Sequence, residues 1–335
     1  MTATGARSPA ADNPPPELVA RFREALGRLW PEGGKLGLAV SGGPDSMAML
    51  LFAEAAIPGQ FDVATVDHGL RPESADECAM VAQVCAERGI ACEILRVQVR
   101  EGNLQMSARD ARYSALGGWA GMRELTAIAT AHHADDQAET LLMRLNRGSG
   151  VAGLAGVRER SWLYELGVDV AVIRPLLSFR RRDLEQLVNA SGMDVARDPS
   201  NLDDHFDRVR IRKALAEAGW LNPLAISRSA SHLAEADEAL EHMTNAAVRD
   251  YVMRHHDRVE CVPLPDRAIA FRVVERVIKW LGGTARGGDI GRLLDRLERC
   301  EGGNVGGVHA IVKGAWGEAE APTWVFRPEA PRRTS

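Results

Sequence analysis

Between residues 35 and 147, short apolar runs alternate with segments of helical apolar spacing. The runs at residues 35–40, 61–67, 90–99 and 125–131 predict β-strands, and residues 45–56, 73–88, 106–122 and 135–147 predict helices. The runs lack polar alternation, so we expect both faces of their sheet to be buried. Strands that alternate with helices of this length indicate βαβ units. The pattern predicts an α/β fold: a doubly wound, Rossmann-like parallel sheet.

The rest of the chain predicts additions to this sheet. The length of 335 residues is enough for two domains. Residues 1–16 are rich in Pro and Ala and predict a disordered tail, followed by a helix at residues 16–29. A last strand at residues 170–177 and helices at 179–190 and 209–218 complete an α/β domain of residues 17–218. Residues 219–256 predict a helical connector, and residues 257–335 a small C-terminal α+β domain.

Composition excludes several classes of protein. The formal net charge is −5, so a uniformly basic nucleic-acid-binding surface is excluded. No apolar stretch approaches the ~20 residues of a membrane-spanning helix, and the N-terminus lacks the apolar core of a signal peptide. The five cysteines are an odd number with no C-x-x-C pair, which favours reduced thiols. We therefore expect a cytoplasmic protein without membrane partners.

The strongest motif, SGGPDS, lies between a predicted strand and a predicted helix. It comprises Ser41, Gly42, Gly43, Pro44, Asp45 and Ser46. Glycines let the backbone approach a ligand closely, and a helix N-terminus offers unpaired N–H groups to an anion. No Gly-Lys-Ser/Thr follows, so this is not a Walker A loop. The motif predicts a pyrophosphate cradle; a plain capped turn is the alternative.

A second motif, HHADDQAET, follows the strand predicted at residues 125–131. It places His132 and His133 at the carboxyl edge of the sheet, and Asp136 and Glu139 on one helical face. Acids beside an anion cradle would hold Mg²⁺ or attract a cationic amine. A zinc site and ordinary acids at a helix N-terminus stay open as alternatives.

Paired arginines accompany these motifs. Arg109 and Arg112 are three residues apart, and Arg208 and Arg212 four apart, so each pair shares a helical face. Guanidinium groups suit phosphates and adenine edges, although solvated surface arginines look the same in sequence. A G-x-G-x-x-G match at residues 148–153 follows a helix, so we expect a flexible loop at the site rim there rather than a dinucleotide site.

SGGPDS resembles the PP-loop of the N-type ATP pyrophosphatases, and the wider set of motifs resembles the bacterial tRNA(Ile)-lysidine synthetases. The further motifs occur in the family's order at residues 67–71 (DHGLR), 108–113 (ARDARY), 131–140 (AHHADDQAET), 147–150 (RGSG), 174–177 (RPLL) and 198–201 (DPSN). They span residues 36 to 212, over half of the chain. Two positions depart from the family pattern, since Val209 stands where the family has Asn and Arg197 where it has an acid.

The resemblance implies a reaction on the wobble cytidine (position 34) of the CAU-anticodon tRNA(Ile). ATP adenylates C2 of the base and free L-lysine then replaces AMP to form lysidine. It also implies that residues 17–218 are the catalytic domain, that residues 257–335 bind tRNA, and that ATP and Mg²⁺ are required. A monomer and a homodimer both stay open.

The resemblance further implies roles for individual residues. Residues 41–46 would bind ATP, with Asp45 on the Mg²⁺ side, and Asp136 and Glu139 would bind the lysine amine. Arg112, His132 and Arg208 would contact ATP or the adenylate. Arg180–Arg182 would touch tRNA phosphates or lie in solvent, and the role of Arg109 stays open.

Three rival functions share parts of this pattern. A cytidine thiolase of the same loop class needs cysteine pairs, which the sequence lacks. A small-molecule amide-forming synthetase shares the loop but has no need of the C-terminal domain. A catalytically degenerate tRNA-binding protein would not need an intact SGGPDS.

Overall fold

The structure is a computed structural model that describes residues 13–70, 73–98, 104–165, 168–196, 207–314 and 322–329. These residues form two compact units, Met1–Ala234 and Glu235–Ser335, and helix α9 (Pro223–Tyr251) runs through the boundary. Residues 1–12 of the predicted tail lie outside the described residues, and α1 begins at Pro16. No described helix is long and apolar enough to cross a membrane.

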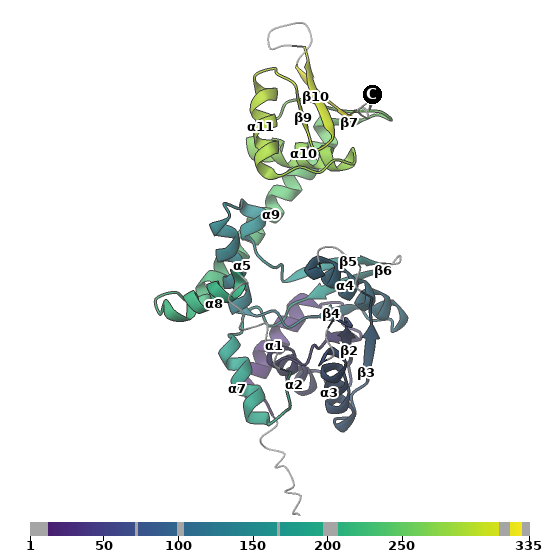
Figure 1. Cartoon of the computed structure of the whole chain (residues 1–335), viewed down its shortest axis with the longest axis vertical. Helices are drawn as coiled ribbons and strands as arrows, with labels where there is room; N and C mark the ends of the chain where they lie inside the picture. Colours follow the sequence, from purple (N-terminus) through teal and green to yellow (C-terminus); the bar gives the residue numbers. More distant parts are fainter. Residues whose placement is uncertain are drawn as a thin grey trace, which may run out of the picture. The chain divides into compact units, whose positions relative to one another are not determined.

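The first unit is built on a six-stranded sheet of order β3-β2-β1-β4-β6-β5 (Figure 1). Its strands are β1 (Leu36–Ala39), β2 (Phe61–Asp67), β3 (Cys92–Arg96), β4 (Ala127–Ala129), β5 (Arg160–Glu165) and β6 (Val168–Ile173). All neighbouring strands pair in parallel except β5, which is antiparallel to β6. The predicted α/β fold is therefore confirmed, and the unpredicted β5 adds an antiparallel edge.

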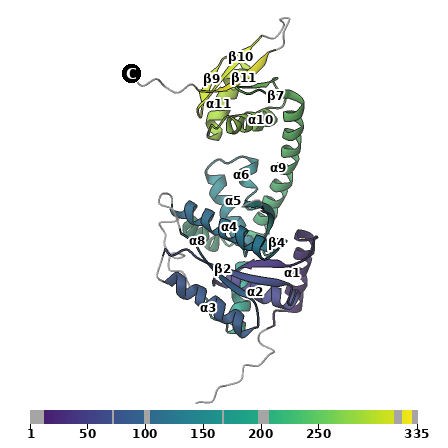
Figure 2. The same cartoon turned by 90° about the vertical axis from the view of Figure 1, so that its right-hand side faces the viewer.

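Helices cover both faces of this sheet. The covering helices are α1 (Pro16–Leu29), α2 (Pro44–Ala56), α3 (Glu73–Glu87), α4 (Leu104–Met122) and α7 (Arg181–Ser191). Helix α5 (Ala134–Asn146) packs against α6 (Val151–Leu154) and α8 (Asp207–Glu217). One core joins side chains of α1, α2, α3 and α7 to the sheet, and a second core joins α4 to its opposite face. Figure 2 shows α4 across the sheet from α2 and α3. The sheet is doubly wound, as predicted.

Helix α2 fixes the position of the SGGPDS loop. Every residue from Ser46 to Ala53 is buried, because α2 packs between β1 on one side and α1 and α7 on the other. A helix that is apolar all round is stable only when it is enclosed in this way. The loop between β1 and α2 is thus held at both ends by buried structure.

The second unit is an α+β module. Its five-stranded antiparallel sheet has the order β7-β8-β11-β10-β9. The elements are β7 (Val252–Arg254), β8 (Val259–Cys261), α10 (Arg267–Trp280), α11 (Gly287–Glu298), β9 (Gly303–Val305), β10 (Val308–Lys313) and β11 (Thr323–Pro328). Residues 252–254, expected to continue the helical connector, form β7 instead because they pair with β8. The helices and the hairpin confirm the expected α+β character.

Candidate active site

The SGGPDS loop leaves the carboxyl end of β1 and enters α2 at Gly43 and Pro44. The hydroxyl of Ser46 donates to the carbonyl of Gly43 (2.9 Å) and accepts from the N–H of Ser41 (3.1 Å), which holds the loop in a curl. Gly42 has φ +83°, and a Cβ at that position would lie 3.1–3.3 Å from Met80, Val81 and Ala196. Only glycine meets both requirements.

In the part of the chain that the structure describes, no side chain caps the N-terminus of α2. The first-turn amides of a helix have no partner within the helix, so those of Asp45 and Ser46 stay available to an anion. The strand order also reverses beside β1, since β2 and β3 lie on one side of it and β4 and β6 on the other. Ligands of open α/β sheets bind at such a switch point. The loop therefore has the geometry of an anion cradle.

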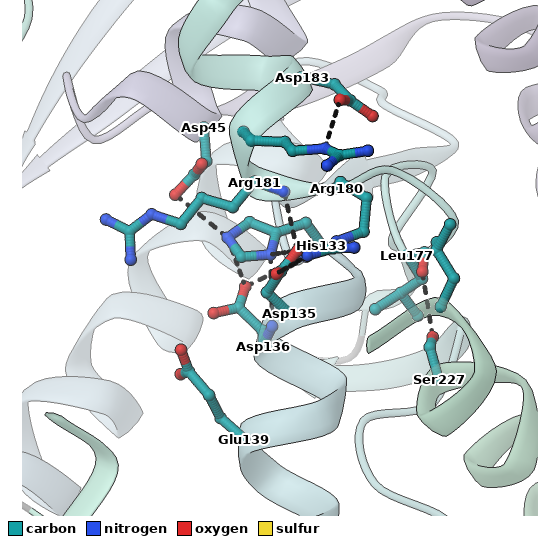
Figure 3. Close-up of polar contacts among 12 residues, drawn as sticks. Asp45, His133, Asp135, Asp136, Glu139, Leu177, Arg180, Arg181, Asp183 and Ser227 are labelled. Atoms are coloured by element: carbon teal, nitrogen blue, oxygen red, sulfur yellow. Dashed lines mark hydrogen bonds and ion pairs between the residues drawn. The ribbon is translucent and has the colours of Figure 1, made fainter. Parts of the chain in front are cut away.

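His133 links this loop to the acidic helix α5 (Figure 3). It is the N-cap of α5: its Nδ1 accepts from the N–H of Asp136 (3.3 Å), and Oδ2 of Asp136 accepts from the N–H of His133 (3.1 Å). Nδ1 is thereby occupied, so the ring proton lies on Nε2, which is 3.5 Å from Asp45 Oδ2. Burial lowers the pKa of His133, but Asp45 and Asp136 outweigh that effect and raise it.

His132 points elsewhere. Its Nδ1 is 3.0 Å from the hydroxyl of Thr130. Burial lowers the pKa of His132 to about 3, and Arg174, Arg112 and Arg208 reinforce that effect against the opposing charge of Asp136. The imidazole is neutral at physiological pH. The two rings thus have different hydrogen-bond partners, and they belong to no group of three metal-ligating side chains within the described ranges.

Asp136 and Glu139 share one face of α5, as predicted, and both are already paired. Arg208 donates to Asp136 Oδ1 (2.7 Å) and to Glu139 Oε2 (2.6 Å), and Arg212 donates to Glu139 Oε1 (2.7 Å). The side chain of Glu139 is 1% exposed. Burial raises the pKa of Asp136, but His133 and Arg208 outweigh it, and the pKa is lowered.

The three consecutive arginines at the start of α7 have different environments. Arg180 pairs with Asp135 (3.2 Å), and Arg182 with its neighbour Asp183 (3.3 Å). The Arg181 guanidinium bonds Glu185 (2.9 Å). Burial lowers its pKa, but Glu185, Asp45 and Glu139 outweigh that effect and raise it. Arg181 is the one of the three on which Asp45 and Glu139 act, and Arg180 is held by Asp135 (Figure 3).

Arg112 lies close enough to His132 and His68 to lower the pKa of each. Both arginines lie over the ring of Tyr113, with the guanidinium carbon 4.9 Å from the ring centroid for Arg109 and 5.6 Å for Arg112. The structure brings Asp45, Arg112, His132, Asp136, Glu139 and Arg208 into one connected cluster and leaves Arg109 at its side.

Three further predicted positions remain, two outside the described residues and one in the segment at residues 148–153. Residues 197–201, with the DPSN motif, and Arg71 lie outside the described residues. The segment expected as a flexible loop at residues 148–153 contains helix α6, and Arg144 donates to the carbonyls of Gly153 (2.6 Å) and Gly156 (3.2 Å). These bonds hold the segment that contains α6 against α5. The G-x-G-x-x-G match follows helix α5 and not a strand, so it lacks the strand–turn–helix order of a dinucleotide site.

The sequence placed His133 only at the edge of the sheet and suggested Arg212 for phosphates or adenine, so their bonds to Asp136 and Glu139 were not predicted. The spacing of His133 and Asp136, a polar residue followed three positions later by an acid, is the signature of a capping box and was available in the sequence. The pairing of Arg212 with Glu139 spans 73 residues and has no local signal.

The donor set suits Mg²⁺ better than zinc. Oδ1 of Asp45 is buried beside the loop and has no hydrogen-bond partner among the described residues. Within the described ranges, no three His, Cys, Asp or Glu side chains are arranged to hold a metal ion by themselves. Mg²⁺ typically uses one or two carboxylates together with substrate phosphates and water. The residues present fit a magnesium ion that arrives with a nucleotide.

Comparisons with known proteins agree with this geometry. The family model of the PP-loop domain matches residues 16–218. The tRNA(Ile)-lysidine synthase of Novosphingobium aromaticivorans is 47% identical over 312 residues, which cover 92% of this chain and 93% of that protein. The enzyme of the same name from Zymomonas mobilis is 36% identical, with 85% and 88% covered.

Among solved structures, the U34-tRNA thiolase NcsA from Methanococcus maripaludis matches with a TM-score of 0.55 at 19% identity, over 65% of this chain and 79% of that one. This likeness shows the shared fold alone. The stretch matched by the PP-loop model contains every site residue described above, and the similarity to the two synthases extends over most of the chain. The protein therefore belongs to the tRNA(Ile)-lysidine synthase family.

Proposed function

We propose that this chain is an ATP-dependent carbon–nitrogen ligase that forms lysidine at the wobble cytidine of the CAU-anticodon tRNA(Ile). The C2 carbonyl oxygen of the base attacks the α-phosphate of ATP and releases pyrophosphate. The ε-amine of free L-lysine then attacks C2, loses a proton and expels AMP. The observation that carries the proposal is the uncapped loop at residues 41–46, joined through His133 to the acids of α5 in a chain of this family.

The loop and its neighbours supply the adenylation half of the reaction. The amides of Asp45 and Ser46 would bind the β- and γ-phosphates, and Arg181 lies beside Asp45 to bind the released pyrophosphate. Asp45 would hold Mg²⁺ through its unpartnered Oδ1. When bound, Mg²⁺ neutralises charge on the leaving pyrophosphate.

The cluster on α5 would serve the lysine half. Asp136 and Glu139 attract the ammonium of lysine, and each carboxylate oxygen has a second lone pair in addition to the one that the arginines use. With a pKa of about 3, His132 is too weak a base to deprotonate lysine at neutral pH. His132 is therefore assigned to binding ATP or the adenylate, together with Arg112 and Arg208.

One assay tests the function. Purified protein is incubated with ATP, labelled lysine and a tRNA(Ile) transcript, and label in RNA is measured together with AMP and pyrophosphate. We expect label to enter RNA with release of AMP and pyrophosphate, and a transcript with uridine at position 34 to stay unlabelled. Label that does not depend on the wobble cytosine, or no label, would contradict the proposal. Labelled free small molecules would favour an amide-forming synthetase.

A variant tests the loop within the same assay. Asp45→Asn removes the charge at the loop and keeps its shape, so we expect turnover to fall at least about a hundredfold at unchanged far-UV circular dichroism. Asp183→Asn is the control, because that carboxylate on α7 pairs with Arg182. Full activity of Asp45→Asn would refute the role of the loop.

The proposed function places the protein in the cytoplasm, where tRNA is modified, with tRNA(Ile) and free lysine as substrates. The C-terminal unit would supply further tRNA contacts. A homodimer stays a prediction, and the molar mass from light scattering decides it.

A further inference from the structure

A hollow of about 320 Å³ lies between α4 and the edge strands β5 and β6, and it has no part in the roles assigned above. The residues that matter for its chemistry are Arg109, Asp110, Tyr113, Ser161, Trp162 and Arg174. Its volume falls within the range of small-molecule and nucleotide sites. Its lining is cationic and aromatic, with Asp110 as an exposed exception.

Arg174 forms the floor of the hollow and is 5% exposed. Its Nη1 donates to the carbonyl of Arg158 (2.6 Å) and lies 3.1 Å from the hydroxyl of Ser161. Its Nε is buried and has no hydrogen-bond partner in the described part of the chain. A buried guanidinium normally pairs with an anion, since an unmet charge away from water is costly. Arg174 therefore offers a preformed donor to an anionic ligand.

Tyr113 supports the same conclusion. Its buried hydroxyl interacts with the Arg174 guanidinium, although the two groups form no hydrogen bond of normal geometry within the described ranges. Burial raises the pKa of Tyr113, but Arg174, Arg112 and Arg109 outweigh that effect and lower it. Arg109 and Arg174, which line the hollow, and the neighbouring Arg112 therefore all act electrostatically on the Tyr113 hydroxyl.

The rim provides flat surfaces. Trp162 on β5 is 52% exposed, and tryptophan is enriched at binding surfaces relative to the rest of a protein surface. Arg160 lies 5.0 Å from the centroid of Trp162, and Arg109 lies over the ring of Tyr113. Aromatic rings and guanidinium planes beside a phosphate-binding group are the combination that holds an unstacked RNA nucleotide.

We propose that this hollow binds one unstacked nucleotide of the RNA substrate, with its phosphate on Arg109 and Arg174 and its base against Trp162. The site adjoins the reaction centre, because Arg174 acts electrostatically on His132. It would hold the anticodon loop open beside the ATP site. This inference rests on the proposed function and specifies how its RNA substrate is gripped.

The test measures binding of an anticodon stem-loop RNA and the KM values of the three substrates in full-length protein. Trp162→Ala is expected to weaken RNA binding and raise KM for tRNA roughly tenfold, with Trp162→Phe restoring most of the loss. Arg109→Gln is expected to lower the slope of log K against log salt by about one, since one phosphate contact is lost, whereas Trp162→Ala leaves that slope unchanged. KM for ATP and for lysine stays at the wild-type value.

Trp220→Ala is the matched control, because Trp220 is 83% exposed and does not line the hollow. The assignment of the hollow would be overturned if Trp162→Ala and Arg109→Gln kept wild-type RNA affinity. An equal loss of RNA affinity in Trp220→Ala would also overturn it, as would a rise in KM for ATP or lysine in the variants of the hollow. If the wild-type protein forms lysidine and the variants bind RNA normally, only this inference is refuted. Wild-type protein that forms no lysidine refutes the proposed function itself.

Discussion

Two adjacent histidines at the start of α5 have opposite electrostatic behaviour. His133 faces the carboxylates of Asp45 and Asp136, which raise its pKa against burial. His132 is buried among arginines and its pKa falls to about 3. Neighbouring residues in extended backbone point to opposite sides, so one peptide unit suffices to give the two rings different surroundings.

This difference predicts an acid dependence of stability. Between pH 6.5, the usual pKa of histidine, and about 3, the unfolded chain binds a proton at residue 132 that the native protein does not, so stability falls as pH falls. His132→Asn removes this effect, and Asn can still bond Thr130. We expect the variant to lose about 2 kcal/mol less than wild type between pH 7 and pH 5, measured by urea unfolding.

His133 has the opposite sign, since its raised pKa gives stability that is present at low pH and lost as pH rises through the native value. His133 is still present in the His132→Asn variant, so the difference in stability between the variant and the wild type isolates the contribution of residue 132. Equal losses in both proteins would show that His132 is protonated normally in the native state.

At the scale of elements, α5 and α8 are joined by the cluster around Glu139. Its buried carboxylate bonds Arg208 and Arg212, whereas Arg147 and Asp207 form an exposed pair between the same two helices. A buried carboxylate contributes more than an exposed one, because its removal leaves cations without a partner in low dielectric. Glu139 is therefore expected to hold α8 in place as well as to face the substrate.

Glu139→Gln tests this structural role. We expect it to lower the free energy of unfolding of the first unit by about 2 kcal/mol, less than for a fully buried pair because both arginines are partly exposed. Arg147→Ala, which breaks the exposed pair, is the control and should change stability little. Denaturant unfolding measures both. An unchanged Glu139→Gln would mean that the acid serves substrate binding alone.

At the scale of the whole molecule, the two units have separate hydrophobic cores. Phe52 is fully buried in the core of the first unit, and Phe326 in the core of the second. Cores that share no side chains can lose stability independently.

Reciprocal truncations test that independence. Phe326→Ala should destabilise its own unit by about 3–5 kcal/mol and speed hydrogen exchange in α10 and α11, with little effect on β1 and α2. Phe52→Ala should produce the reverse pattern. Hydrogen exchange resolved by peptide distinguishes the two results. Faster exchange across both units in either variant would show that they unfold as one.

Local sequence was enough to predict the α/β alternation, the SGGPDS loop and the acidic face of α5. These features depend on windows of a few residues, in which helical spacing, glycine and the strand–helix order already fix the outcome. The predicted helix at residues 16–29 and strand at residues 61–67 have the bounds observed for α1 and β2.

The partners of these residues could not be predicted from the sequence. Arg208 meets Asp136 across 72 residues of sequence. Strand β5 turns back along β6, and Arg174 is buried without a carboxylate partner in the part of the chain described. Such partners are selected by the packing of distant elements, because the energy of a buried charge depends on its whole surroundings and not on its neighbours in the chain.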